Sequence, residues 1–135
     1  MPIARELNIQ LENRPGALAK VCQALAGRNV NIVAFQASTA ERRSQIHLVV
    51  NNPEAAKMVL AAEGLIYTEG EVVQIALRSL PGELARVTSR LAAVNMNINY
   101  AYGGSDLLFF GIAEVARAAK IPDQAAAAAT GAFRK

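Results

Sequence analysis

Residues 13–18 read Asn-Arg-Pro-Gly-Ala-Leu, residues 29–32 read Asn-Val-Asn-Ile, and most of this stretch occurs twice in the chain. From Pro15 to Ile32, 10 of 18 residues recur at a constant shift of 66 positions and without a gap, between Pro81 and Ile98. A repeat of this length indicates two copies of one structural unit. The question for function is therefore what the backbone at the two Pro-Gly turns binds or stabilises.

The hydrophobic pattern around the first copy predicts six elements. Leu7, Ile9 and Leu11 alternate with polar residues, which is typical of a half-buried strand. At Pro15 the spacing changes to that of a helix, with Pro15 expected at the first helical position. The expected order is strand, helix, strand, strand, helix and strand, at residues 5–12, 15–27, 30–38, 45–50, 53–64 and 65–68.

The second copy predicts the same order with a weaker end. Its expected elements are a strand at 73–77, a helix after Pro81-Gly82, strands at 97–102 and 107–115, a weak helix from Pro122, and a fourth strand near 132–134 that is short or missing. The fold class is therefore α+β, as two tandem ferredoxin-like βαββαβ units, with antiparallel sheets and helices on one face. The expected domains are residues 1–69 and 70–135.

Composition narrows the class of function. The chain has 135 residues, of which 53% are hydrophobic and 19% charged, so it is globular. Its net charge of +3 comes from scattered residues, which argues against a nucleic-acid surface. No apolar run approaches the roughly 18 residues of a membrane span, and the single cysteine favours a reducing compartment. We expect a soluble, cytoplasmic protein.

The motif Leu-x-Ile-x-Leu-Glu-Asn-Arg-Pro-Gly-Ala-Leu-Ala, followed by Leu-Ala-x-x-Asn-Val-Asn-Ile, resembles an ACT domain. The whole chain is similar to the small stand-alone proteins made of two tandem ACT domains, well over residues 5–69 and 71–115 and weakly beyond 115. The resemblance implies a non-catalytic regulatory protein. It also implies that an amino acid or similar metabolite binds between two domains, against the backbone of the turn from first strand to first helix.

Independently of the resemblance, the residues of the first turn are suited to bind a carboxylate. A helix N-terminus leaves backbone N–H groups unpaired and attracts negative charge. We therefore expect the N–H groups of residues 16–18 to bind a ligand, with Gly16 allowing its close approach and Asn31 offering an amide if its strand lies beside the turn. The alternative is that the turn only starts a helix and the asparagines make local bonds. The candidate residues of this copy are Asn13, Arg14, Gly16, Ala17, Leu18, Asn31 and Ile32.

The second turn departs from that pattern. Ser79-Leu80 replaces the Asn-Arg pair, and Glu83, in place of Ala17, repels a carboxylate. Either this site is vestigial, or Glu83 meets the ammonium group of a ligand. Its candidate residues are Gly82, Glu83, Leu84, Asn97 and Tyr100, the last as a possible lining of a groove between the domains.

Side chains outside the two turns are weaker candidates for a functional site. Cys22 lies on the apolar stripe of the first helix, so we expect a core thiol. His47 is expected on the outer sheet face, without the further ligands that a metal site needs. We therefore expect no metal and no cofactor. Val33, Phe35, Val49 and Phe109 are expected to make that outer face apolar, which predicts a homodimer.

Two other functions share this fold. An RNA-recognition module has the same order of elements but needs a basic, aromatic third strand, which the sequence lacks. A small acyl-phosphate hydrolase needs an arginine and an asparagine at an anion-binding loop, for which Asn13 and Arg14 are the only candidates. The leading interpretation is an amino-acid sensor. The sequence does not identify the amino acid or the regulated protein.

Overall fold

The computed structural model describes residues 1–104 and 106–122. The chain forms two compact units. We call Arg5–Gly70 the first unit, and Met1–Ala4 together with the chain from Glu71 onward the second unit. The strand β1 (Ile3–Glu12) contributes to both units, as does β4 (Tyr67–Ala76).

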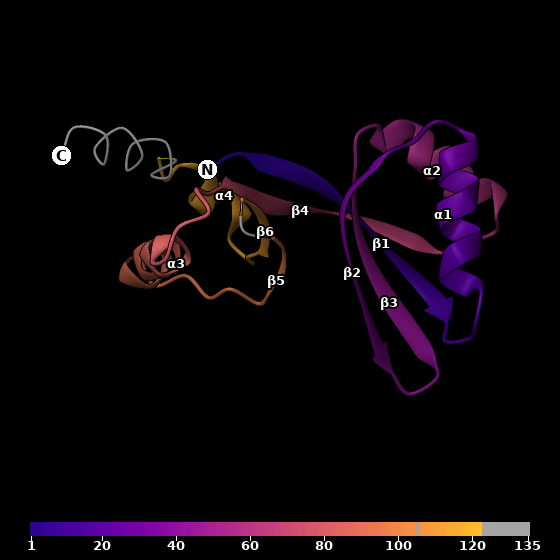
Figure 1. The fold of residues 1–135 in the computed structure, drawn as a ribbon, viewed down its shortest axis with the longest axis horizontal. Coiled ribbons are helices and arrows are strands. Elements are labelled where there is room, and N and C mark those ends of the chain that lie inside the picture. Colours follow the sequence, from indigo (N-terminus) through magenta and orange to yellow (C-terminus); the bar gives the residue numbers. More distant parts are fainter. Residues whose placement is uncertain (105, 123–135) are drawn as a thin grey trace. The chain divides into compact units, whose positions relative to one another are not determined.

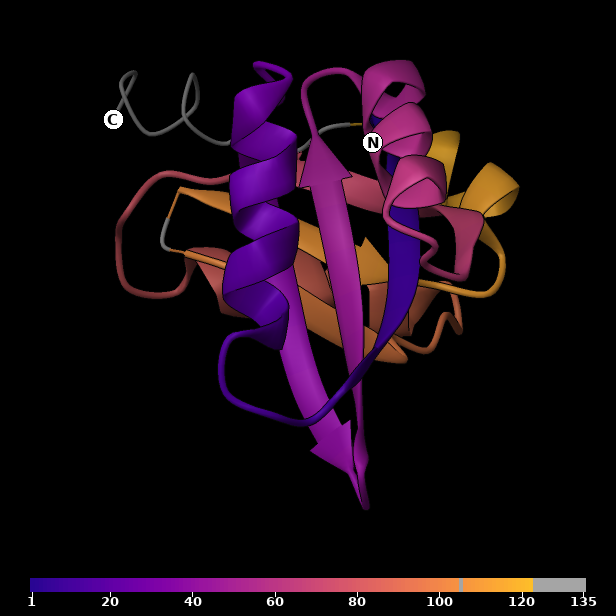
Figure 2. The ribbon, with the colours of Figure 1, turned by 90° about the vertical axis from the view of Figure 1, so that its right-hand side faces the viewer.

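In the first unit, four strands lie in the order β2-β3-β1-β4, where β2 is Ile32–Ala40 and β3 is Arg43–Val50. The β1–β3 and β2–β3 pairs are antiparallel. The helices α1 (Ala17–Gly27) and α2 (Pro53–Ala62) lie together on one face of this sheet (Figures 1 and 2). The alternating residues of β1 enter the core between the sheet and the helices, since Leu7, Ile9 and Leu11 are buried there against residues such as Leu25 and Leu60. This confirms the expected α+β fold.

The first helix begins two residues later than predicted. Its N-cap is Gly16, so Pro15 is not the first helical residue. The backbone N–H of Ala17 donates to the carbonyl of Arg14 at 3.2 Å, and Gly16 has φ of 88° and ψ of −14°. A positive φ at the third position is the mark of a type II turn, which favours proline at the second position and glycine at the third. Pro15 and Gly16 therefore build a turn, and the helix starts after it.

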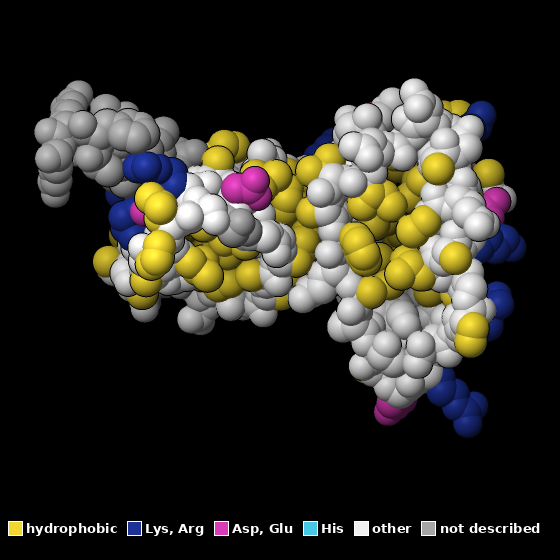
Figure 3. All heavy atoms as spheres, viewed as in Figure 1, with side chains coloured by type: hydrophobic (Ala, Val, Ile, Leu, Met, Phe, Trp, Pro, Cys, Tyr) yellow, Lys and Arg dark blue, Asp and Glu magenta, His cyan; other side chains and the backbone are white. Residues whose placement is uncertain are grey.

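The edge strand β2 changes its register near its start. Ile32 lies opposite Val50, but Phe35 lies opposite Leu48, with an irregularity between Ile32 and Ala34. Residues opposite each other on antiparallel strands share a face, so Phe35 is on the helix side with Leu48. The prediction that Phe35 is on the outer face is wrong, because a bulge adds one residue and reverses the alternation. Phe35 is 52% exposed, and Figure 3 shows hydrophobic side chains on this part of the surface.

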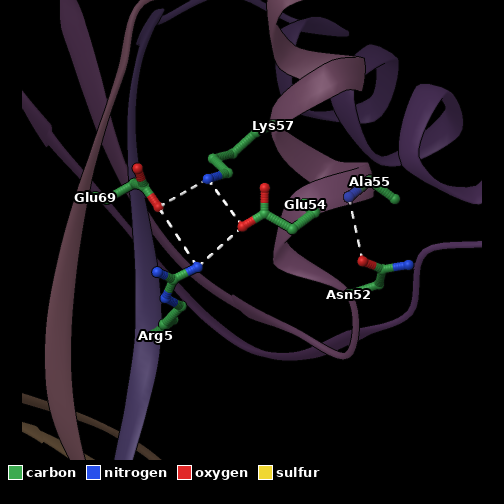
Figure 4. Close-up of polar contacts among 6 residues, drawn as sticks. All are labelled: Arg5, Asn52, Glu54, Ala55, Lys57 and Glu69. Atoms are coloured by element: carbon green, nitrogen blue, oxygen red, sulfur yellow. Dashed lines mark hydrogen bonds and ion pairs between the residues drawn. The ribbon is translucent and has the colours of Figure 1, made fainter.

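An ion-pair network joins α2 to the two strands at the middle of the sheet (Figure 4). Lys57 of α2 binds Glu54 Oε1 at 3.0 Å and Glu69 Oε1 of β4 at 3.2 Å, and Arg5 of β1 binds Glu54 Oε1 at 3.0 Å. The same helix is capped by Asn52, whose side chain accepts from the N–H of Ala55 at 3.2 Å. The start of α2 is therefore fixed by both a cap and charge.

In the second unit, the strand order is β1-β4-β6-β5, where β5 is Tyr100–Gly103 and β6 is Leu107–Gly111. The helix α3 (Glu83–Ala93) contributes Val87 and Leu91 to its core, and a short helix, α4, spans Val115–Ala119. Met1 is buried in this core, and the N–H of Gln74 donates to the carbonyl of Pro2 at 2.9 Å. The first four residues of the chain thus complete the second unit.

Several predicted boundaries shift. The strands expected at 65–68 and 73–77 are one strand, β4. The strand expected at 107–115 ends at Gly111, because α4 begins at Val115, and the strand expected at 97–102 begins only at Tyr100. The helix expected through 125–129 and the strand near 132–134 lie outside the described residues.

Candidate functional site

The two Pro-Gly turns have the same geometry. In the second copy the N–H of Glu83 donates to the carbonyl of Leu80 at 3.3 Å, and Gly82 has φ of 88° and ψ of −10°. An added Cβ at Gly16 or Gly82 would meet no atom within 4 Å, so space does not require glycine there. Glycine is required because the backbone at both positions is left-handed. The backbone conformation alone therefore accounts for glycine at both positions, and the expectation that Gly16 allows close approach of a ligand stays a prediction.

Each turn leaves backbone donors free at the start of its helix. At the first turn, the N–H of Ala17 is already used, while no hydrogen bond within the described chain engages those of Gly16, Leu18 and Ala19. Neither helix has a side-chain cap. The free donors are thus residues 16, 18 and 19, and not 16 to 18 as the sequence suggested. Such donors, at the positive end of a helix, attract a carboxylate.

A backbone hydrogen bond fastens the first turn to the hairpin between β2 and β3. The N–H of Asn13 donates to the carbonyl of Arg42 at 2.8 Å, and Glu12 lies opposite Arg43 in the sheet. Figures 1 and 2 show the turn and the hairpin at the same end of the first unit. Between them lies a cavity of about 470 Å³, and the residues that line it all have polar or charged side chains: Glu12, Asn13, Arg14, Glu41, Arg42 and Arg43.

The charges in this cavity are only partly paired. Arg14 Nε donates to Glu12 Oε2 at 3.1 Å, and Arg43 Nη1 donates to Gln10 Oε1 at 3.1 Å. Within the part of the chain that is described, no hydrogen bond or ion pair engages the side chains of Arg42 and Asn13. One guanidinium and one amide of this cavity are therefore available to a ligand. The free backbone donors belong to the residues that follow Arg14 in the chain.

The asparagines after the helices lie elsewhere. Asn31 follows the C-terminal end of α1, and a helix of 11 residues is about 16 Å long. The N–H of Asn31 donates to Asn51 Oδ1 at 2.9 Å, and Ile32 packs against the core of the first unit. Asn97 likewise follows the far end of α3. Within one unit, neither asparagine lies beside the Pro-Gly turn.

The second turn borders a different kind of cavity. It has a volume of about 340 Å³ and is lined by Leu77, Arg78, Ser79, Leu80, Pro81, Glu83, Leu84, Gly104 and Leu108. Tyr100 does not line it; the Tyr100 ring stacks on Tyr102 with centroids 6.4 Å apart and covers Gly111. The two turns therefore have the same backbone conformation but different neighbouring side chains.

Sequence reasoning missed Glu41, Arg42 and Arg43 as neighbours of the first turn. Only the strand pairing brings the hairpin to the turn, although the adjacent charges at 41–43 are visible in the sequence. His47 is on the outer face as predicted, where its Nδ1 lies 3.2 Å from Oε1 of the buried Glu6. Cys22 is only partly buried.

The described residues contain no cluster of three His, Cys, Asp or Glu side chains that could hold a metal ion. Among them, no helix is long and apolar enough to cross a membrane.

Comparison with known proteins finds one domain match and several similar structures. The model of the ACT domain matches residues 5–63. A search of the curated proteins finds no match. Among solved structures, protein BT0572 from Bacteroides thetaiotaomicron is 26% identical, with a TM-score of 0.79, and the match covers 85% of this chain and 83% of that one.

The regulatory subunit of aspartate kinase from Thermus thermophilus, in its ligand-free form, is 27% identical, with a TM-score of 0.59 and 87% of both chains covered. That from Thermus flavus is 26% identical, with a TM-score of 0.53, and the match covers 88% of this chain and 92% of that one. Residues 5–63, which hold the first turn and both helices of the first unit, are thus similar to the ACT domain in sequence and in fold.

Proposed function

We propose that the protein is a non-catalytic, cytoplasmic regulatory module that binds an amino acid at the first Pro-Gly turn. The observation that carries the proposal is the pair of features at this turn, namely the free N–H groups of Gly16, Leu18 and Ala19 and the unpaired Arg42 guanidinium. The match of residues 5–63 to the ACT domain supports it. So do similar structures that are regulatory subunits of aspartate kinase.

In this proposal the ligand carboxylate accepts hydrogen bonds at the turn, and Glu12 or Glu41 meets its ammonium group. Both expected domains, 1–69 and 70–135, are ACT-like in this proposal, because the repeats share ten residues and one turn geometry. Met1–Ala4 are the exception to these bounds, since they pack in the second unit. Asn31, Ile32, Asn97 and Tyr100 do not lie at the turns of their own units. In this proposal they contribute to a ligand only through a second copy of the chain.

The first test is a thermal-shift screen of the twenty amino acids. A ligand at about 100 times its Kd should stabilise the protein by about 2.7 kcal/mol. Calorimetry with the best amino acid then compares Arg42→Gln with Arg28→Gln. Arg28 is a matched control, because it is exposed, has no ion pair within the described chain, and lies at the other end of α1.

Arg42→Gln should weaken binding by about 10- to 150-fold, the range for a hydrogen bond to a charged group. Arg28→Gln should change the affinity less than twofold. Equal effects of the two variants would reduce the role of Arg42 to long-range charge. Absence of any amino-acid ligand, with turnover of an acyl phosphate instead, would favour the hydrolase.

A further inference from the structure

Three charged residues lie along one side of the helix α3. Glu83, Arg86 and Arg90 are spaced three and four residues apart, and this spacing places side chains on the same side of a helix. Glu83 Oε2 accepts from Arg86 Nε at 3.3 Å, and these two side chains are only 16% and 26% exposed. Arg90 is also partly buried. We call these three residues the α3 stripe.

The α3 stripe holds most of the buried side-chain atoms that lack a hydrogen bond within residues 1–104 and 106–122. The donors Arg86 Nη1, Arg86 Nη2 and Arg90 Nε are buried there without a partner, and so is the acceptor Glu83 Oε1. The fifth and last such atom is Asn8 Oδ1. A bidentate pair between Glu83 and Arg86 would use one of the three donors and leave two. Because buried polar groups are nearly always hydrogen-bonded and unpaired buried charges are costly, the stripe requires a further group that supplies acceptors.

The first unit shows that this fold does not require the charges of the α3 stripe. In the repeat, the places of its three residues are taken by Ala17, Lys20 and Ala24. Lys20 is exposed, and none of these three counterparts has a buried, unpartnered side-chain atom among the described residues. A buried ion pair is seldom more stabilising than apolar residues of similar volume. A ligand is therefore a better reason for these charges than folding.

The combination of three donors and one acceptor selects among anions. Arginine only donates hydrogen bonds, and its guanidinium binds oxyanions through several N–H groups at once. The Glu83 carboxylate only accepts, so it repels an anion that carries no proton. Inorganic phosphate keeps at least one proton at neutral pH, whereas sulfate keeps none. Phosphate can therefore satisfy both the arginine donors and Glu83 Oε1.

We propose that the α3 stripe binds one inorganic phosphate ion. The phosphate oxygens accept from Arg86 Nη1, Arg86 Nη2 and Arg90 Nε, and the phosphate hydroxyl group donates to Glu83 Oε1. Neither arginine lines the cavity at the second turn. The ligand is not an amino acid, and the residues that bind it belong to the second unit. The proposal therefore goes beyond the proposed function, and either can fail alone.

The test is calorimetry on the full chain at pH 8 and constant ionic strength, with three dianions: inorganic phosphate, methyl phosphate and sulfate. A phosphate monoester has a second pKa of about 6, so at pH 8 only inorganic phosphate still carries a proton. Inorganic phosphate should bind at least about tenfold more tightly than the other two, the effect of one hydrogen bond to a charged group. The same comparison separates free phosphate from the phosphoryl group of a larger metabolite.

Two variants test the residues of the stripe. Arg90→Gln should weaken binding of inorganic phosphate by about 10- to 150-fold, because a hydrogen bond to a charged group is lost. Glu83→Gln should remove most of the preference over sulfate, since the carboxylate no longer repels an unprotonated anion. Arg28→Gln is the control, because Arg28 is exposed, belongs to the first unit and has no ion pair within the described chain. It should leave the affinity for phosphate unchanged.

Arg42→Gln separates this proposal from the amino-acid site, because phosphate must still bind to a chain whose first turn is altered. Loss of phosphate binding in Arg42→Gln but not in Arg90→Gln would place the ion at the first turn and overturn the proposal. The proposal is also overturned if none of the three anions binds, or if methyl phosphate or sulfate binds as tightly as inorganic phosphate.

Discussion

Gly16 and Gly82 have the same backbone conformation, with φ of 88° at both and ψ of −14° and −10°. Each is the third residue of a type II turn that ends one strand and starts one helix. Because the two turns have the same conformation but different surroundings, the structural role of the turn can be distinguished from its role in binding. The turn fixes the helix start, and the residues around it set the chemistry.

Glycine at the turn is expected to be required for stability even without a ligand. Gly16→Ala should cost about 1–2 kcal/mol, because φ of 88° is left-handed backbone that other residues rarely adopt. Gly27→Ala, in the same helix and with open space at its Cβ, should instead stabilise by about 0.4–1 kcal/mol. Urea denaturation of both variants measures the difference. A stable Gly16→Ala variant would contradict the turn assignment.

The ion-pair network should make stability depend on pH in a defined window. The Lys57 ammonium, and less strongly Arg5, holds the pKa of Glu54 below its usual value, and the Glu54 and Glu69 carboxylates raise the pKa of Lys57. The Glu54 contribution is therefore present above the unfolded carboxyl pKa, about 4.3, and is lost as pH falls through its lower folded value. The Lys57 contribution is present below about pH 10.4 and is lost as pH rises through its higher folded value.

Lys57→Met should accordingly be less stable than the native chain at neutral pH, and the difference should shrink in acid and in high salt. Lys20→Met is the control, because Lys20 is exposed and has no ion pair within the described residues. Denaturation at pH 7 and in acid, with and without salt, provides the measurement. A difference that stays constant between these conditions would rule out the electrostatic explanation.

Removing Met1–Ala4 should loosen the second unit and spare the first. Met1 is buried against Val73 and Ile75, and its loss should cost about 2–5 kcal/mol, as for other buried methionines. Hydrogen exchange should show faster exchange at the amide of Gln74, which donates to Pro2. Amides of β3 in the first unit are the internal control, and unchanged exchange at Gln74 would contradict the assignment of these residues to the second unit.

The homodimer stays a prediction, but only two of the four residues expected to form its interface are exposed enough to do so. Val49 and Phe109 are already buried within the chain, at 5% and 1% exposure, whereas Val33 and Phe35 on the edge strand β2 are 45% and 52% exposed. Phe35→Ser should therefore weaken a dimer in sedimentation at micromolar concentration. Ile66→Ser, at 77% exposure elsewhere in the first unit, should not. A native chain that sediments as a monomer would refute the prediction.

The sequence by itself determined the repeat, the fold class and the elements of the first unit. Local patterns were enough, because the alternation of Leu7, Ile9 and Leu11 and the Pro15-Gly16 pair act within a few residues of themselves. These local patterns did not determine the strand boundaries that depend on pairing with neighbouring strands. The merging of two expected strands into β4 and the bulge that turns Phe35 to the helix side are set by hydrogen bonds to neighbouring strands.

The features of the candidate sites also fall into those that the sequence determined and those that the tertiary structure determined. The turns and their free N–H groups follow from the residues of the turn itself. Only the tertiary structure placed Arg42 beside Asn13, bonded Asn31 to Asn51, and brought Leu108 to the same cavity as Leu77 and Leu84. These contacts join residues far apart in the chain, and their partners are chosen by strand register and packing, which no local pattern encodes.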